Sequence, residues 1–111
     1  MAPWEIWTYD FPDEGTHPCV IFSNAIRLVN PAFDRINILL CRTLRGPLQR
    51  ELNPAEILLD RADGLDWETI CRVDAVHFVL KARLRERRGI VCKERRRQIC
   101  QRMLRVLPFE F

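Results

Sequence analysis

Short apolar runs separated by turn residues fill most of the chain before residue 93. Runs of this length that are rich in aromatic and β-branched residues are typical of strands. The pattern predicts strands over residues 4–11, 18–23, 35–43, 56–59, 68–74 and 75–80. Between the second and third strands Asn30-Pro31 interrupts a mixed sequence, so we expect a loop over residues 24–34.

The run over residues 35–43 has the strongest strand pattern. Ile36, Ile38 and Leu40 form one apolar face, and Leu39 and Cys41 lie on the other face. A strand with two apolar faces is buried on both sides. We therefore expect this strand at the centre of the sheet.

The last segment has a different period. Ile99, Met103 and Leu107 recur every four residues and form one apolar stripe of a helix over residues 93–107, which Pro108 ends. Short strands followed by one packed helix predict a mainly β fold, a small barrel with a C-terminal α-helix across it. We expect a single domain over residues 1–111 because neither a repeat nor a change of composition divides the chain.

Composition narrows the class of protein. Apolar residues make up 48% of the chain and charged residues 30%, which fits a globular domain. No apolar run approaches the roughly 20 residues that a membrane-spanning helix needs. The first ten residues lack the basic and apolar regions of a signal peptide. We expect a cytoplasmic protein with no membrane partner.

The five cysteines are odd in number and contain no Cys-x-x-Cys pair. Cys19, Cys41 and Cys71 lie inside apolar runs, so we expect them to be buried free thiols. Zinc would require closely spaced pairs of ligands, which this sequence lacks. The sequence therefore predicts reduced cysteines and neither a metal site nor a cofactor.

Charge is unevenly distributed along the chain. Residues 81–105 contain 11 lysines and arginines against two glutamates, a net charge of +9, whereas the remaining residues carry a net charge of −6. A basic end of this kind attracts a polyanion or an acidic protein. The simpler interpretation is a solvated helix face rich in arginine.

The order of several motifs resembles that of the MazF/PemK toxins. The motifs are Glu5-Ile6-Trp7, His17-Pro18 with an apolar strand behind it, Ile38-Leu39-Leu40-Cys41-Arg42-Thr43, Arg72-Val73-Asp74 and Lys81-Ala82-Arg83-Leu84. The similarity extends from about residue 5 to residue 107. Each motif is weak alone, but their order and spacing are fairly specific.

This resemblance implies an SH3-like barrel that acts as the toxin of a type II toxin–antitoxin system. Proteins of the family are usually homodimers that cleave single-stranded RNA without a metal and are blocked by a cognate antitoxin protein. The implied activity is that of an endoribonuclease, or mRNA interferase, in which the 2′-hydroxyl attacks the phosphate. Such a reaction leaves a 2′,3′-cyclic phosphate and a 5′-hydroxyl.

The match to the family motifs makes His17, Thr43, Arg72 and Asp74 the candidate catalytic residues. Arg72 and Asp74 are two apart on a predicted strand and so share one face. The resemblance makes Arg72 a phosphate stabiliser or proton donor and Asp74 a possible base. Because a neighbouring arginine weakens a carboxylate as a base, Asp74 alternatively only orients Arg72. Without the resemblance the two would form an ordinary surface ion pair.

His17 departs from the family, which usually has an arginine before the proline. An imidazole is a base or an acid near neutrality, so His17 replaces a permanent cation with a proton carrier. It alternatively marks a branch with altered or lost activity. Thr43 ends the central strand, where its hydroxyl can bind a phosphate or simply cap the strand.

Contacts to RNA are expected from a second set of residues, Ser23, Arg42, Arg45 and Trp67. Trp67 lies in a loop where its ring can stack on a base, whereas Trp7 is expected in the core. Two other functions remain open on the same barrel. One is a non-catalytic inhibitor of gyrase like CcdB, and the other is a plain RNA-binding protein that uses the basic segment.

Overall fold

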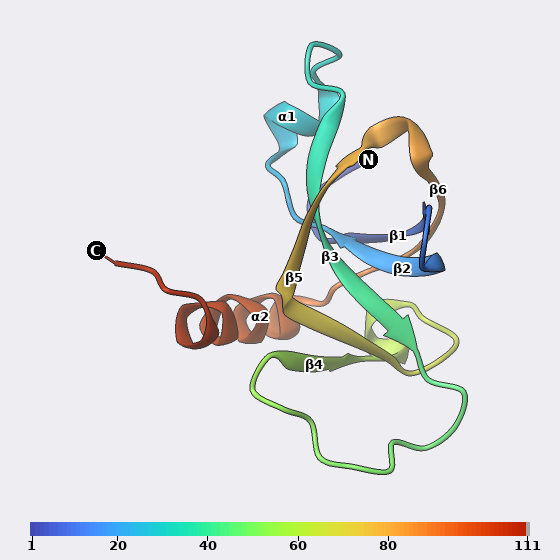
Figure 1. Ribbon diagram of the computed structural model, residues 1–111, viewed down its shortest axis with the longest axis vertical. Coiled ribbons are helices and arrows are strands. Elements are labelled where there is room, and N and C mark those ends of the chain that lie inside the picture. Colours follow the sequence, from blue (N-terminus) through green and yellow to red (C-terminus); the bar gives the residue numbers. More distant parts are fainter. Residues whose placement is uncertain (111) are drawn as a thin grey trace.

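Six strands and a C-terminal helix build the protein (Figure 1). The computed structural model describes residues 1–110. The strands are β1 (Glu5–Phe11), β2 (Gly15–Ile21), β3 (Arg35–Thr43), β4 (Glu56–Leu59), β5 (Thr69–Leu80) and β6 (Leu84–Ile90). The α-helices are α1 (Ala25–Val29) and α2 (Lys93–Val106), and two 3-10 turns are η1 (Arg61–Asp63) and η2 (Lys81–Arg83). The prediction of a mainly β fold with a C-terminal helix is confirmed.

All six strands belong to one antiparallel sheet with the order β4-β5-β3-β2-β1-β6. Within the described residues β4 and β6 do not pair, so the expected barrel is not closed by hydrogen bonds. The turn η1, which follows the edge strand β4, instead contacts the other edge strand, β6. Gly89 of β6 packs directly on the carbonyl of Asp63, and Arg95 of α2 bonds Asp63 and Asp60, at 2.6 Å from Asp60.

The strand β3 lies inside the sheet, between β5 and β2, as its two apolar faces predict. Ile36 and Ile38 belong to a core cluster on one face. Leu39 and Cys41 belong to a second cluster on the other face, which α2 covers with Ile99 and Met103. The helix therefore stabilises one face of the sheet by burying the apolar stripe that its sequence shows.

The expected loop over residues 24–34 contains the short helix α1. Asn24 caps this helix, because its side chain accepts a hydrogen bond from the backbone N–H of Arg27 at 2.9 Å. Lys81 donates to the carbonyl oxygens of Arg27 and Asn30 at the other end, at 2.6 and 3.1 Å. A helix of five residues is too short to produce a visible period, so the interpretation as a loop was wrong.

The two strands expected over residues 68–74 and 75–80 form the single strand β5. Neither glycine nor proline separates them, and Val73 and Val76 continue the strand pattern on the two sides of Asp74 and Ala75. The prediction also missed β6, whose sequence is dominated by charge. Arg85 and Arg87 of β6 pair with Asp10 and Glu5 of β1 at 3.1 and 2.6 Å, so cross-strand ion pairs replace an apolar pattern.

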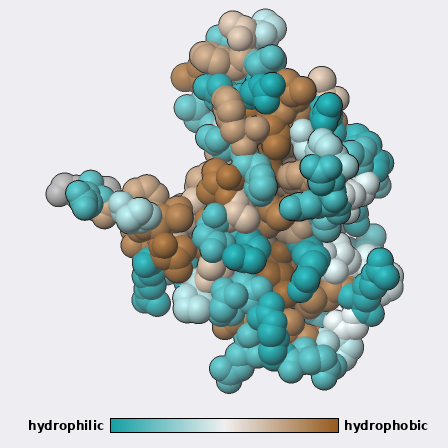
Figure 2. Space-filling model, in the orientation of Figure 1, coloured by the Kyte–Doolittle hydropathy of each residue, from teal (hydrophilic) through white to brown (hydrophobic). Residues whose placement is uncertain are grey.

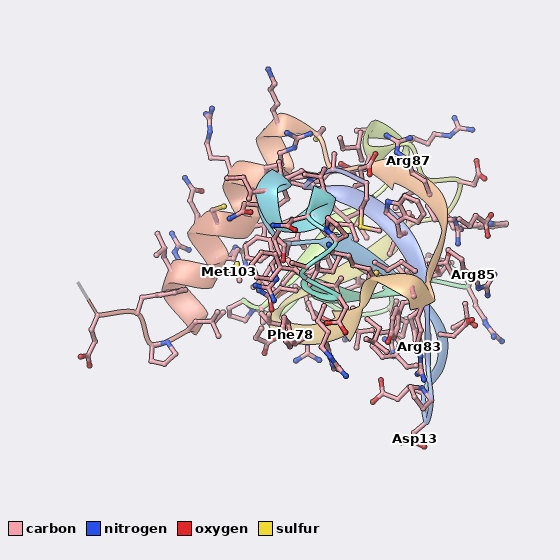
Figure 3. The ribbon with its side chains drawn as sticks, turned by 90° about the horizontal axis from the view of Figure 1, so that it is seen from above. Asp13, Phe78, Arg83, Arg85, Arg87 and Met103 are labelled. Atoms are coloured by element: carbon pink, nitrogen blue, oxygen red, sulfur yellow. The ribbon has the colours of Figure 1, made fainter. Side chains whose placement is uncertain are left out.

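The basic residues of segment 81–105 do not form the single basic end that the sequence predicts. Figure 3 shows Arg83, Arg85 and Arg87 on the side of the protein opposite Met103 of α2. The basic segment is therefore split between two surfaces. Several of its arginines are used to hold acidic side chains of the remaining chain.

Cys19, Cys41 and Cys71 are buried free thiols, as predicted. Cys41 lies opposite Cys71 in the ladder between β3 and β5. Burial raises the pKa of Cys19 to about 12 and raises the pKa of Cys41 well above its usual value. Thiols in this state are poor nucleophiles and act as small core residues.

Apolar side chains also reach the surface, both on the part of the molecule that carries α1 and beside α2 (Figure 2). Arg27 lies over the rings of Phe33 and Phe78, at 4.5 and 5.2 Å from their centroids, which places these rings beside α1. Among residues 1–110, no helix has the length and apolar character needed to cross a membrane.

The contact between Gly89 and η1 gives a test of the fold. A methyl group on Gly89 would overlap the Asp63 carbonyl, whereas one on Gly46 would meet no atom within 4 Å. We expect Gly89→Ala to lower the free energy of unfolding by at least about 2 kcal/mol and Gly46→Ala to change it by less than about 0.5 kcal/mol. Urea denaturation measures both. Equal stability of the two variants would contradict the packing described.

Candidate active site

A cleft opens where β2 and β3 stop pairing. The last paired residues are Cys19 and Leu40. The next residue of β2 is Pro18, which has no amide N–H to donate, so the ladder does not continue past it. His17 and Arg42 lie just beyond this point and line the space between the diverging strands.

The cleft consists of two hollows that meet at His17 and Arg42. One, with a volume of about 470 Å³, is lined by these residues with Thr43 and Arg45, and we call it the Thr43 hollow. The other, of about 380 Å³, extends past His17 to Glu56 and Arg72, and we call it the Glu56 hollow. Each hollow has room for roughly one nucleotide, and the two together have room for two adjacent nucleotides of a nucleic-acid chain.

Most of the candidate site residues predicted from the sequence line the cleft. His17, Arg42, Thr43 and Arg45 line the Thr43 hollow, and Arg72 lines the Glu56 hollow. The imidazole of His17 is half-buried, and its Nε2 lies 2.8 Å from the carbonyl oxygen of Glu14. That contact orients the ring at the boundary between the hollows.

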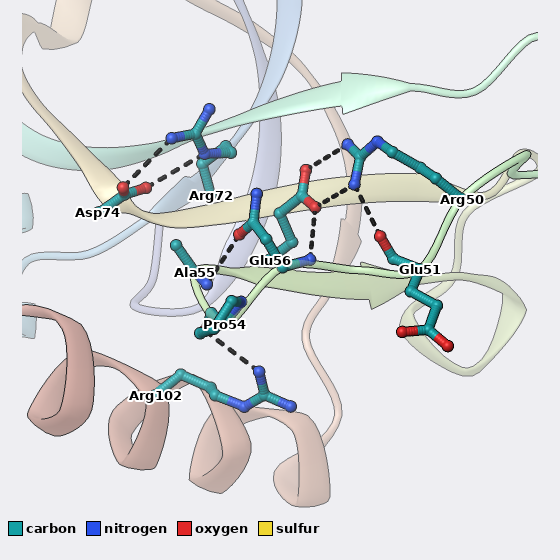
Figure 4. Close-up of polar contacts among 9 residues, drawn as sticks. Arg50, Glu51, Pro54, Ala55, Glu56, Arg72, Asp74 and Arg102 are labelled. Carbon is teal, nitrogen blue, oxygen red and sulfur yellow. Dashed lines mark hydrogen bonds and ion pairs between the residues drawn. The ribbon is translucent and has the colours of Figure 1, made fainter.

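Asp74 lies outside both hollows and bonds Arg72 instead. Nε and Nη2 of Arg72 donate to the two carboxylate oxygens of Asp74 at 3.1 and 3.2 Å (Figure 4). This bidentate bond raises the pKa of Arg72. The geometry favours the alternative in which Asp74 orients the guanidinium.

Ser23 is placed apart from the cleft. Its hydroxyl accepts a hydrogen bond from the backbone N–H of Asn37 at 2.9 Å, and it lines a separate hollow beside Trp4 and Phe22. In the structure Ser23 therefore joins the end of β2 to β3. The expected contact of Ser23 with RNA stays a prediction.

Trp67 lies at the far end of the Thr43 hollow. It is 63% exposed and lines a small hollow of about 210 Å³ with Leu44 and Arg45, which also line the Thr43 hollow. An exposed ring in this position offers a face on which a base can stack. Trp7, expected in the core, is only half-buried and donates its Nε1–H to Glu5 at 3.2 Å.

The sequence interpretation missed Arg50 and Glu56. Only 4% of Glu56 is exposed, and its carboxylate accepts two hydrogen bonds from Arg50, at 2.6 and 2.7 Å, and one from the backbone N–H of Asn53 at 2.9 Å. These bonds, led by those from Arg50, hold the pKa of Glu56 down at about 2. Glu56 is therefore a fixed anion at neutral pH.

The loop between β3 and β4 is anchored at two points. Arg50 reaches from the loop to Glu56 at the start of β4, and Arg102 of α2 donates to the carbonyl of Pro54 at 3.1 Å (Figure 4). Among the described residues, we find no group of three His, Cys, Asp or Glu side chains placed to hold a metal ion. The site is thus an arginine-rich cleft with one histidine and one buried carboxylate.

Residues 2–107 match the family model of the PemK-like, MazF-like toxins of type II toxin–antitoxin systems. The chain belongs to this family. The match covers all of the strands and α2, and it includes every residue of the cleft. The chain matches none of the curated protein sequences with which it was compared.

Several solved structures of PemK/MazF toxins and related endoribonucleases have the same fold. A mycobacterial endoribonuclease in complex with its cognate antitoxin is 18% identical, with a TM-score of 0.74 over 100% of this chain and 98% of that chain. The Mycobacterium tuberculosis toxin MazF-mt6 is 12% identical, with a TM-score of 0.77 over 96% and 99% of the two chains. A chain of the MazE–MazF structure from Deinococcus radiodurans is 13% identical, with a TM-score of 0.68 over 99% of this chain and 97% of that chain. At these identities the likeness establishes the fold.

The low pKa of Glu56 predicts how stability depends on pH. At neutral pH we expect Glu56→Gln to lower the free energy of unfolding by about 1–2 kcal/mol, since solvent screens the exposed Arg50. The pKa of this carboxyl is about 2 in the folded protein, against an ordinary value of 4.5. The advantage of the wild type is therefore complete above about pH 5 and is lost as the pH falls toward 2. Urea denaturation between pH 7 and pH 3 measures this difference, and a gap that stays constant would contradict the assignment.

Proposed function

We propose that this PemK/MazF protein is the toxin of a type II toxin–antitoxin system and a metal-independent endoribonuclease that cuts single-stranded RNA in the cleft between β2 and β3. The observation that carries the proposal is the meeting of His17, Arg42 and Thr43 in one hollow, with Arg72 in the next. These residues come from three strands, and together they supply a proton carrier, a hydroxyl and cations for a phosphate.

The chemistry assigns one role to each group. His17 takes the proton of the 2′-hydroxyl, and the 2′-oxygen forms a bond to phosphorus while the bond from phosphorus to the 5′-oxygen breaks. Arg42 and Arg72 neutralise the charge that develops on the phosphate, and the Thr43 hydroxyl donates to one of its oxygens. Because Asp74 raises the pKa of Arg72, Arg72 keeps its proton. The leaving 5′-oxygen takes a proton from water, and the hydroxide that remains takes the proton from His17, which restores the base.

The family favours this function over the alternatives. The mycobacterial neighbours include proteins described as endoribonucleases, and one of them is bound to its antitoxin. No residue of the cleft gives a specific reason for gyrase as the target. A plain RNA-binding protein would need the cations but not a half-buried histidine beside a threonine. We expect a cytoplasmic protein whose activity a cognate antitoxin blocks by covering the cleft.

A homodimer is part of the same proposal. Exposed apolar side chains form a patch on α1, the following loop and β5, which we call the α1–β5 patch: Ile26, Val29, Phe33, Val76 and Phe78. Exposed apolar patches of this kind are typical of protein interfaces. A second copy can bind there through an isologous contact.

RNA cleavage tests the proposed activity. The protein incubated with a long single-stranded RNA in EDTA should give products with 2′,3′-cyclic phosphate and 5′-hydroxyl ends. We expect His17→Ala and Arg72→Ala each to slow cleavage by about 100-fold or more, because one removes the base and the other a phosphate cation. Mapping of the RNA ends and single-turnover rates measure both effects.

Arg61→Ala is the matched control for loss of a positive charge, since Arg61 is exposed on η1 and lines neither hollow. This variant should cleave at the wild-type rate. Absence of cleavage by the wild type, or wild-type rates in both cleft variants, would refute the proposed activity. Inhibition of gyrase supercoiling without cleavage would favour the CcdB-like alternative.

Sedimentation tests the homodimer. We expect the wild type to sediment as a dimer at micromolar concentration and Phe78→Glu to sediment as a monomer, because a charge in the α1–β5 patch must be desolvated on association. Glu86→Lys on β6, outside the patch, serves as the control and should remain dimeric. A monomeric wild type would sink this part of the proposal.

A further inference from the structure

Arg50 is held in the Glu56 hollow by three hydrogen bonds. Its Nη1 and Nη2 donate to the two oxygens of Glu56, and Nη1 also donates to the carbonyl of Glu51 at 3.0 Å. Glu56 is held in turn by the backbone of Asn53. A side chain bonded at three points keeps one orientation and loses little further entropy when it binds a ligand.

These bonds leave one edge of the Arg50 guanidinium unused. A guanidinium has five N–H donors in a planar fork, and three of those of Arg50 are taken by Glu56 and Glu51. Nε–H and the second proton of Nη2, which lie on the same edge, have no acceptor among the described residues. Two parallel donors on a fixed edge fit a ligand with two adjacent acceptors.

The charge of the hollow indicates a neutral ligand there. The charge of Arg50 is balanced by Glu56 and that of Arg72 by Asp74, and Glu14 and Arg42, which also line the hollow, carry one charge of each sign. The Thr43 hollow, in contrast, contains Arg42 and Arg45 and no acidic residue. Because Arg42 lines both hollows, a phosphate is drawn to the boundary between them, and the rest of the Glu56 hollow suits an uncharged base.

The walls of the Glu56 hollow agree with this assignment. Leu40 is half-buried and forms the exposed apolar part of its lining, to which the nearly fully buried Cys41 and Ile70 add little surface. An apolar wall beside a polar fork is the surface that a flat heterocycle binds, with its face on the wall and its edge on the donors.

We propose that Arg50 reads a guanine in the Glu56 hollow, next to the phosphate that is cleaved at His17. This inference rests on the proposed function and names the base that the cleft selects. The O6 and N7 acceptors of guanine lie side by side and match two donors of one arginine edge, whereas adenine has a donor in place of O6. Glu56 acts as a positioning residue, because it holds Arg50 and does not itself touch the base.

Cleavage of modified RNA tests the assignment. In a set of short single-stranded RNAs that differ at one position, the wild type should cut beside guanine about 10- to 100-fold faster than beside the other bases, the range for one bidentate contact. Replacing that guanine by 7-deazaguanine removes the N7 acceptor and should lower the rate by about 10-fold. Arg50→Lys should lower the rate beside guanine to the rate beside the other bases, since lysine lacks the fork.

Two further variants distinguish recognition of guanine by Arg50 from a general effect of substitution on the protein. Glu56→Gln frees Arg50 and should reduce the preference for guanine, although Arg50 is still present. Arg61→Lys, the same substitution outside the cleft, should keep the full preference. Thermal unfolding of each variant confirms that it is folded under the assay conditions.

The outcomes distinguish this inference from the proposed function. If 7-deazaguanine is cut as fast as guanine, or if Arg50→Lys keeps the preference, Arg50 does not read the base. If Arg50→Lys slows the cutting of all RNAs equally, it contacts a phosphate and the inference is wrong. If no RNA is cut, the proposed activity fails, and binding of the same RNAs to the wild type, followed by fluorescence anisotropy, still decides whether Arg50 prefers guanine over 7-deazaguanine.

Discussion

The end of the pairing between β2 and β3 is the constraint on which the site depends. Past Cys19 and Leu40 the two strands separate, because the next residue of β2 is a proline. Had the ladder continued, Arg42 would lie against His17 as a strand neighbour, and no space would remain between them. Because the strands separate, the side chains of His17, Arg42 and Thr43 line a cleft instead. The sheet thus supplies a rigid frame, and its local interruption supplies the site.

Ion pairs divide the arginines of this protein into two classes. Arg85, Arg87 and Arg95 bind carboxylates of other elements and hold β6 and α2 in place. Arg42 and Arg45 line the Thr43 hollow and bond no carboxylate of the described residues. The net charge of residues 81–105 therefore overstates the positive potential at their surface, since several of these arginines are paired with carboxylates. Within the cleft, the cations that attract an anion most strongly are those that the fold leaves without a carboxylate partner.

Patterns in the sequence predicted the elements that bury apolar residues and missed those that do not. The strand β3 and the helix α2 were predicted because their apolar periods are strong, whereas β6 is held by cross-strand charge pairs and α1 is too short to show a period. The same limit applies to the site. His17, Thr43 and Arg72 belong to motifs in strands, but Arg50 lies in an irregular loop, and only the fold places it on Glu56.

The central claim is that the cleft between β2 and β3 binds the RNA strand that is cut. The most direct test is a titration of the ¹⁵N-labelled protein with a short RNA carrying 2′-deoxyribose at the cleaved position, which cannot react. The account predicts that chemical shifts change at His17, Arg42 and Thr43 and hardly change on the outer face of α2. Shift changes confined to the arginines of α2, with the cleft unaffected, would contradict it.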